Sequence, residues 1–124
     1  MKKTADYRAS IFNAFKELGV SANLLGYEYS AYIIEGILTD KYTRNDNMVK
    51  VVYKEAAREF KTTPSAVERG IRHSITRVFD RAPVDIIEKY FGNTVSSYAG
   101  KLTNCEFLFM IAEHIKVNNC PELP

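Results

Sequence analysis

The chain has 124 residues, of which 46% are hydrophobic and 26% charged, and it is most simply one domain over 1–124 with a single core. No apolar run approaches the roughly 20 residues that a membrane helix needs, and the N-terminal lysines precede no apolar stretch. The sequence therefore predicts neither a membrane span nor a signal peptide. Two cysteines, Cys105 and Cys120, make no disulfide framework, so we expect reduced thiols in a cytoplasmic protein.

The net charge is only +2, but positive charge is concentrated in the middle of the chain. Residues 41–81 carry ten lysines and arginines against five acidic residues, whereas residues 1–40 sum to −1 and residues 82–124 to −2. A basic region favours a polyanionic partner, because phosphate neutralisation supplies most non-specific affinity for DNA. A solvated basic face is the alternative, and charge alone does not decide between the two.

Apolar residues recur with helical periodicity along nearly the whole chain, and no alternating stretch predicts a strand. The first helix is expected over about 6–18, with Gly19 as its C-terminal stop. The second is expected over about 27–40, where an internal Gly36 indicates a close helix crossing. A polar loop over 43–47 follows. The residues expected on the buried faces are Ile11, Phe15 and Leu18 in the first helix and Tyr29, Ile33, Gly36 and Ile37 in the second.

Residues 53–72 have the packing pattern of a helix-turn-helix, which we place over about 48–81. Ala57 is small where the second helix crosses the first, and Gly70 is small where the two backbones approach. A helix pair of this shape can place its second helix in the DNA major groove. The core-facing residues are Met48, Val52, Ala56 and Phe60 in a helix over about 48–60, and Val67, Ile71, Ile75 and Val78 in the next, with Phe79 at its edge.

The turn between these two helices is well marked. Thr63 is a natural N-cap and Pro64 fits the first helical position, so the recognition helix is expected to begin at 64 and to continue to about 80 or 81. Lys61 occupies a position that is often glycine in such corners, and this lysine must tolerate the turn geometry imposed there.

Two further helices are predicted after the recognition helix. Pro83 can start a short helix over Val84–Phe91, which Gly92 would stop. A loop over about 93–102 leads to the last helix, where Thr103 and Glu106 form a capping box. Its buried face is expected to contain Phe107, Met110, Ile111 and Ile115, and the tail over 117–124 is expected to fray. The fold class is therefore all-α, a six-helix domain containing a helix-turn-helix.

The side of the recognition helix opposite the core presents polar and charged residues. Arginine can donate two parallel hydrogen bonds to guanine, and glutamate can accept from cytosine. The candidates for base reading are Glu68, Arg69, Arg72 and His73. Those for phosphate contact or positioning are Lys61, Thr62, Thr63, Ser65 and Arg77, together with Lys54; Thr76 completes the polar side. A solvated helix on which Glu68 pairs with Arg72 is the alternative, and such pairing is also compatible with binding.

Several segments together resemble the C-terminal DNA-binding effector domain of the master sporulation response regulator, the stage zero sporulation protein A family. The similarity spans roughly Leu18 to Ile115. The matching segments are Gly19-Val20, Gly26-Tyr27, TTPSAVERGIRHSI at 62–75, Phe91-Gly92 with Thr94-Val95-Ser96, and Thr103-Asn104 with Glu106-Phe107.

This resemblance implies a cytoplasmic transcription factor that recognises a short TCGAA-like box, often as paired half-sites bound by two copies of the domain. It assigns Glu68, Arg69, Arg72 and His73 to the groove. It also implies a contact with RNA polymerase sigma factor through about 81–88, for which the candidates are Arg81, Val84, Asp85 and Glu88. The family carries a phosphoacceptor receiver domain, which these 124 residues do not include. Both a separated effector domain and a free-standing relative remain open.

Other chemistry has little support in the sequence. The only histidines are His73 and His114, and no metal-ligand spacing, glycine-rich phosphate loop or nucleophile motif accompanies them. Cys105 lies at a helix start, which can lower a thiol pKa, but without a partner pattern we expect a small packing residue. We predict no enzyme, no metal site and no cofactor. The competing function is a helical protein-interaction module that binds sigma factor or another regulator without DNA.

Overall fold

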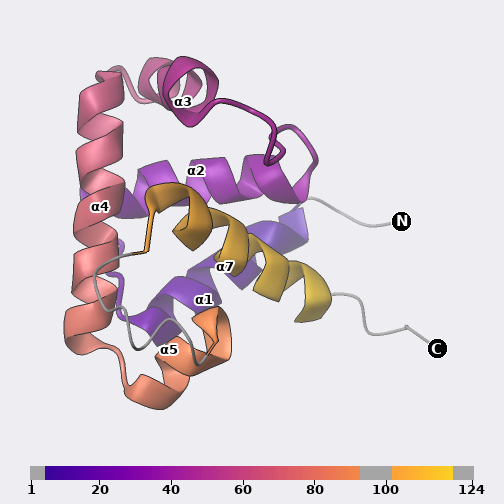
Figure 1. Ribbon diagram of the computed structural model, residues 1–124, viewed down its shortest axis with the longest axis vertical. Coiled ribbons are helices and arrows are strands. Elements are labelled where there is room, and N and C mark those ends of the chain that lie inside the picture. Colours follow the sequence, from indigo (N-terminus) through magenta and orange to yellow (C-terminus); the bar gives the residue numbers. More distant parts are fainter. Residues whose placement is uncertain (1–4, 93–101, 119–124) are drawn as a thin grey trace.

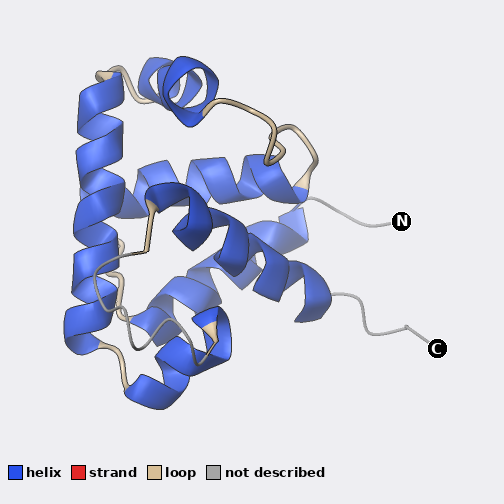
Figure 2. Ribbon diagram, in the orientation of Figure 1, coloured by secondary structure: helices blue, strands red, loops and turns tan. Residues whose placement is uncertain are grey.

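The computed structural model describes residues 5–92 and 102–118, and within them it contains helices and loops but no strand (Figure 2). The prediction of an all-α fold with six α-helices is confirmed for this part of the chain. The elements are α1 (Ala5–Leu18), α2 (Leu25–Leu38), a π-helical turn η1 (Met48–Val52), α3 (Tyr53–Glu59), α4 (Pro64–Arg81), α5 (Val84–Phe91) and α7 (Asn104–Asn118). None of these helices is long and apolar enough to cross a bilayer.

Helix α2 is the centre of the arrangement, since it packs against α1, α4 and α7. Helix α4 stands along one edge, with α3 at one of its ends and α5 at the other (Figure 1). The first residue of α1 and the last residue of α7 both lie on the side away from α4 (Figure 1). Helix α4 therefore lies on the outside of the molecule, and the remaining helices pack on one side of it.

The helices share one hydrophobic core. Burying each large aliphatic or aromatic side chain contributes about 1.5–3 kcal/mol, so this core is the main source of stability. The inward stripe predicted for α4 is confirmed, because Val67, Ile71, Ile75 and Val78 are fully buried. Four residues expected in the core are only half-buried: Ile37, Met48, Phe60 and Met110. Outside α4, the largest fully buried side chains are Phe15, Leu18, Ile33, Ile34, Phe107, Leu108 and Ile111.

Helices α1, α2 and α3 end in the same way. In each, a residue with positive φ follows the helix, and the next residue donates its N–H back to a carbonyl five positions earlier. Gly19 confirms the predicted stop of the first helix, whereas the second ends at Leu38 and not at 40 as predicted. The residues with positive φ are Gly19 (85°), Asp40 (66°) and Lys61 (55°).

Two glycines form the crossing of α2 and α4. A Cβ on Gly26 would lie 2.2 Å from the carbonyl oxygen of Gly70 and 2.2 Å from Ser74 Oγ. The close approach predicted at Gly70 therefore exists, but its neighbour is α2 and not α3. The crossing predicted at Gly36 is wrong, because a Cβ there would meet the ring of Tyr42 in the following loop, at 2.5 Å.

The first helix of the predicted corner begins with an irregular turn. The sequence predicts one helix over 48–60, but 48–52 form a π-helical turn and the α-helix itself covers Tyr53–Glu59. Asn47 explains the start, since its side chain accepts from Lys50 N at 2.8 Å and its carbonyl accepts from both Val51 N and Val52 N. One acceptor serving two donors widens the first turn, and apolar periodicity does not reveal this.

The last two helices follow the prediction closely. Helix α5 covers Val84–Phe91, and Gly92 follows it with φ of 87°. The capping box is confirmed, because Thr103 Oγ1 accepts from Glu106 N at 3.1 Å and Glu106 Oε1 accepts from Thr103 N at 3.0 Å. Helix α7 continues to Asn118. The prediction that the tail frays from 117 is therefore wrong for Val117 and Asn118, which are helical. The rest of that tail, and nearly all of the loop predicted over 93–102, lie outside the described residues.

Candidate nucleic-acid interface

Helix α4 presents a continuous polar side to solvent. Its inward stripe fixes the rotation of the helix, so residues on the opposite side of the wheel point outward. Six side chains on that side are exposed, and we call them the α4 face: Ser65, Glu68, Arg69, Arg72, His73 and Thr76. A row of donors and acceptors on one exposed helix has the dimensions and chemistry that the major groove admits.

The corner before α4 fixes where this helix begins. Thr63 Oγ1 accepts from Ala66 N at 3.1 Å, and Pro64 occupies the first turn, as predicted. Lys61 adopts a left-handed conformation, which confirms that a lysine here has to tolerate a turn geometry suited to glycine. Because Thr62 N donates to Ala57 O at 2.9 Å, the chain leaves α3 and enters α4 within a few hydrogen-bonded residues. The start of α4 is thereby held against α3.

The four predicted base-reading residues all lie on the α4 face, but they are held differently. Glu68, Arg69 and His73 are exposed. Arg72 is exposed as well, yet its Nη1 donates to the carbonyl oxygen of Leu102, at 3.0 Å. The alternative in which Arg72 pairs with Glu68 is not what the structure has, since the only ion pairs within residues 7–92 and 102–118 are Lys41–Glu55 and Lys89–Glu17. An arginine has five N–H donors, so this one bond leaves others for a ligand.

Four of the predicted phosphate contacts, Lys61, Thr62, Thr63 and Ser65, lie at the N-terminal end of α4, whereas Lys54 lies near the start of α3 and Arg77 in the C-terminal part of α4. Lys54, Lys61, Thr63 and Ser65 are exposed, whereas Thr62 and Arg77 are half-buried. The oxygen of the Thr63 hydroxyl already accepts from the backbone, so its hydrogen is the part left for an anion. Lys61, Thr62, Thr63 and Ser65 lie at the start of α4, where free N–H groups and the helix dipole favour negative charge.

A groove of about 630 Å³ runs beside the α4 face, between α4 and the start of α2. Its walls come from Leu25, Gly26 and Tyr29 on one side and from Ala66, Arg69, Gly70, Arg72, His73 and Thr76 on the other. Sequence analysis missed Leu25, which is 67% exposed although it is leucine. Gly26 is the sequence signal that could have identified the exposed Leu25. Where two helix backbones are in contact at glycines, the neighbouring side chains are not covered by the other helix.

The N-terminal end of α7 reaches the same region. Asn104 is buried, and its Nδ2 donates to Tyr53 Oη on α3 at 3.0 Å and to the Glu68 carbonyl on α4 at 3.1 Å. Sequence analysis missed this contact, because Asn104 there appears only as an interior position of the capping box. Its polarity at a position that would otherwise be apolar is the signal that could have identified it.

The predicted sigma-factor residues gather at the corner between α4 and α5. Arg81 at the end of α4 is exposed, as are Val84 and Asp85 at the start of α5, and Glu88 on α5 is half-buried. Val84 is 64% exposed, which makes it an apolar point with charged residues around it. The arrangement has the mixed polarity of a small protein contact.

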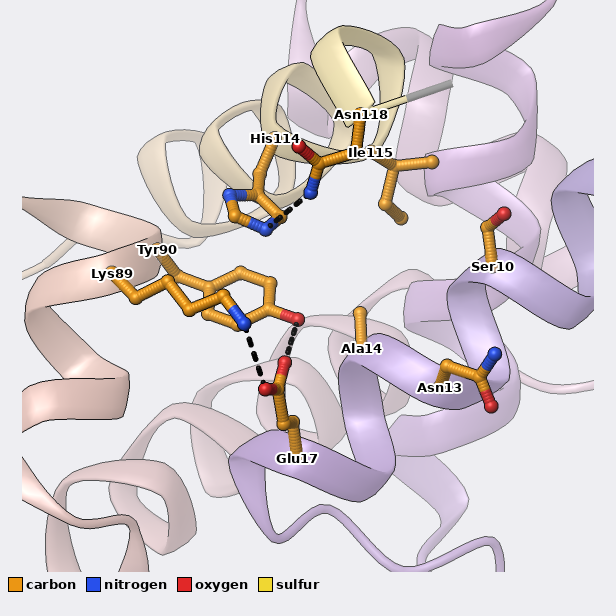
Figure 3. A pocket seen from close by; sticks show the side chains of 9 residues that line it. All are labelled: Ser10, Asn13, Ala14, Glu17, Lys89, Tyr90, His114, Ile115 and Asn118. Carbon is orange, nitrogen blue, oxygen red and sulfur yellow. Dashed lines mark hydrogen bonds and ion pairs between the residues drawn. The ribbon is translucent and has the colours of Figure 1, made fainter. Parts of the chain in front are cut away.

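A second hollow, of about 420 Å³, lies between α1, α5 and α7 (Figure 3). Glu17 accepts from Lys89 Nζ at 2.8 Å and from Tyr90 Oη at 2.5 Å, and both donors point toward its carboxylate (Figure 3). The ring centroid of His114 lies 4.1 Å from that of Tyr90, so this half-buried histidine of α7 packs against α5. These contacts tie three helices together.

The charges in this hollow shift the pKa values of its groups. Hydrogen bonds from Lys89 and Tyr90 lower the pKa of the Glu17 carboxyl. Burial lowers the pKa of His114, and the Lys89 charge adds to this while Glu17 opposes it.

The thiol of Cys105 is a separate case outside this hollow. Burial raises the pKa of Cys105, with Arg44 opposing, so the thiol stays protonated and serves packing. Within the part of the chain that the structure describes, no cluster of three metal-ligating side chains exists.

Comparison with protein families gives one match that covers nearly the whole molecule. Residues 11–115 match the family model described as Sporulation initiation factor Spo0A C terminal. The matched range runs from the middle of α1 to near the end of α7, and thus includes the helical corner and the α4 face. The chain therefore belongs to this family, the DNA-binding effector domains of sporulation response regulators, which act in transcription regulation.

Proposed function

We propose that this domain binds a specific DNA sequence by inserting α4 into the major groove. The observation that carries the proposal is the α4 face, a row of exposed polar side chains on a capped helix that follows a tight corner. Each base pair shows a distinct pattern of donors and acceptors in that groove, and an α-helix fits it. Membership of a DNA-binding family supports the proposal.

In this proposal the four base-reading residues have separate tasks. Arg69 and Arg72 donate to the O6 and N7 acceptors of guanine, and Glu68 accepts from the N4 amine of cytosine. His73 donates to or accepts from a base edge or a neighbouring phosphate. Such contacts make affinity depend on sequence, because a wrong base leaves a charged side chain without its partner.

The flanking residues hold the backbone. Lys54, Lys61 and Arg77 neutralise phosphates, while Thr62, Thr63 and Ser65 donate hydrogen bonds at the start of α4. Contacts of this kind fix the register of the helix on the duplex and carry no sequence information themselves. They also make affinity fall steeply with salt, since counterions are released when the charges pair.

The wider function follows from the family resemblance. The target is a TCGAA-like box, often present as paired half-sites that two copies of the domain occupy on one duplex. The surface of Arg81, Val84, Asp85 and Glu88 then contacts sigma factor of an RNA polymerase bound beside it. Such a regulator works in the cytoplasm, where the bacterial chromosome is, and the domain over 1–124 is the unit that binds.

The decisive experiment is a selection from random duplexes with the purified protein at near-physiological salt. We expect enrichment of a TCGAA-like motif, and we expect the affinity for that motif to fall steeply as salt rises. A helical module that contacts only proteins would enrich no sequence, and its partner affinity would depend on salt less.

Two alanine variants separate base reading from folding. Arg69→Ala and Arg72→Ala should each cost about 1–3 kcal/mol of affinity for the selected duplex and relax preference at one base pair. Only Arg72→Ala should also lower the free energy of unfolding, by about 1 kcal/mol, because it removes the bond to Leu102. Fluorescence anisotropy with all four base pairs at each position, together with urea unfolding, measures both. An equal loss of affinity for every duplex would contradict the base-reading role.

A further inference from the structure

A short segment before and at the start of α7 holds the recognition helix at two successive turns. Leu102 accepts from Arg72 Nη1 at 3.0 Å, and Asn104 Nδ2 donates to the Glu68 carbonyl at 3.1 Å. Glu68 and Arg72 are one helical turn apart, so the two bonds attach this segment to successive turns of α4. We call Leu102 and Asn104 the α7 clamp.

The side chain of Asn104 joins three helices. Asn104 is the first residue of α7. Its Nδ2 donates to Tyr53 Oη on α3, at 3.0 Å, and also to the Glu68 carbonyl on α4. A backbone carbonyl can only accept, so the amide must direct its nitrogen toward Glu68 and cannot be turned over. Asn104 is 6% exposed, and water does not replace these bonds without opening the packing.

The geometry of the amide comes at a cost. Oδ1 of Asn104 is buried and has no hydrogen-bond partner among the residues described. Leaving a buried polar atom unpaired costs about 1–3 kcal/mol, which offsets much of what the two Nδ2 bonds contribute to stability. An amide at this site is therefore explained better by what it aligns than by its contribution to stability.

The alignment concerns the residues proposed to read DNA. Helix α4 is also held by its crossing with α2 at Gly26 and Gly70, and by the hydrogen-bonded turn at Lys61–Thr63. Neither of these contacts involves the carbonyl of Glu68 or the side chain of Arg72. The α7 clamp acts on both. It ties α4 to α3 through Asn104, and it holds the guanidinium of Arg72, a residue that lines the groove beside α2.

We propose that Asn104 is a positioning residue for sequence recognition, which places Glu68 and Arg72 for the bases without touching DNA itself. This inference rests on the proposed function of α4. Phosphate contacts tolerate small movements of a helix, because long charged side chains adjust, whereas a bidentate contact with a base edge does not. Loss of the Asn104 bonds should therefore reduce discrimination between sequences more than it reduces non-specific binding.

The test uses Asn104→Asp, which keeps the size of the side chain and removes its donors. We expect the affinity for the selected duplex to fall about tenfold, the loss of one well-placed base contact, and the affinity for an unrelated duplex to stay within about twofold. Asn104→Ser, which is too short to reach Glu68, serves as a second variant if the carboxylate prevents folding. Urea unfolding of each variant verifies that the protein is folded under the binding conditions.

Tyr53→Phe is the matched control. It removes the acceptor on α3 and leaves the bond from Asn104 to Glu68, so it should lower stability while the ratio of the two affinities stays within about twofold of wild type. If Asn104→Asp and Asn104→Ser retain the wild-type ratio, or weaken both duplexes equally, the inference is wrong and the proposed function stands. If the wild-type protein itself prefers no sequence, the proposed function fails and the inference fails with it.

Discussion

At the scale of single residues, Lys61 combines two opposing demands. Its φ of 55° is a conformation that costs a residue with a Cβ about 1–2 kcal/mol, and glycine adopts it freely. Its ammonium group is exposed beside the start of α4, where a phosphate would bind. The residue that is unfavourable for the turn is thus favourable for the proposed ligand.

Lys61→Gly should separate these demands. We expect the free energy of unfolding to rise by about 0.5–1 kcal/mol, because relief of the strain exceeds the extra entropy of an unfolded glycine. Affinity should fall alike for every duplex, and the magnitude of the salt slope should fall by about 1. Urea unfolding and anisotropy over a salt series measure the two effects.

Lys61→Ala is the control for this pair of effects. Alanine loses the same charge but keeps a Cβ, so the affinity should fall as it does for glycine without the gain in stability. A gain in stability of equal size in the alanine variant would show that the lysine charge, and not the backbone, is unfavourable at this corner.

At the scale of elements, the crossing of α2 and α4 depends on the absence of a side chain. Gly26→Ala would place a Cβ 2.2 Å from a backbone carbonyl that cannot move without shifting α4. We expect a loss of more than about 3 kcal/mol in the free energy of unfolding, the range of severe core disruption. Thermal and urea unfolding measure it.

Gly92→Ala is the comparison for this variant. Its φ of 87° is strained for alanine, but a Cβ there has nothing within 4 Å. The cost should therefore be the backbone strain alone, about 1–2 kcal/mol. Similar losses for the two alanine variants would mean that α2 and α4 separate easily, contrary to the close packing at Gly26.

The sequence predicted the elements well where one local signal decides them. Thr63 and Pro64 mark the start of α4, and the capping box at Thr103 marks that of α7, because a single side chain satisfies the first N–H groups in each case. The apolar stripe of α4 predicted which of its residues point outward. The composition of the α4 face followed from that stripe directly.

The sequence predicted poorly whatever depends on which elements meet. Gly36 and Gly70 are both small, but only the fold shows that one faces a tyrosine ring and the other faces α2. The π-helical turn at 48–52 arises from Asn47 accepting twice, which periodicity does not detect. The contacts of Asn104 and of Arg72 with residues more than 25 positions away were likewise beyond local patterns.

At the scale of the whole molecule, the hollow between α1, α5 and α7 makes stability depend on pH. The pKa of His114 lies below its ordinary 6.5 and that of Glu17 below its ordinary 4.5 in the folded protein. In both cases the unfolded chain takes up protons first as the pH falls. The free energy of unfolding should be at its full value above pH 6.5 and decline below it, with a second decline below pH 4.5.

Urea unfolding between pH 7.5 and pH 4 measures this dependence. His114→Gln should flatten the decline that begins near pH 6.5 and leave the later one, because Glu17 keeps its bonds to Lys89 and Tyr90. An unchanged profile in His114→Gln would assign the decline to other groups.

The placement of the beginning of α1 and of the end of α7 has a practical consequence. The beginning of α1 and the end of α7 lie on the side of the molecule away from α4 (Figure 1). A surface anchor or fluorescent protein attached directly before α1 or directly after α7 would start from that remote side. The polar row on α4 would then face free solution, so kinetic measurements on an immobilised sample would report encounters with an unobstructed helix.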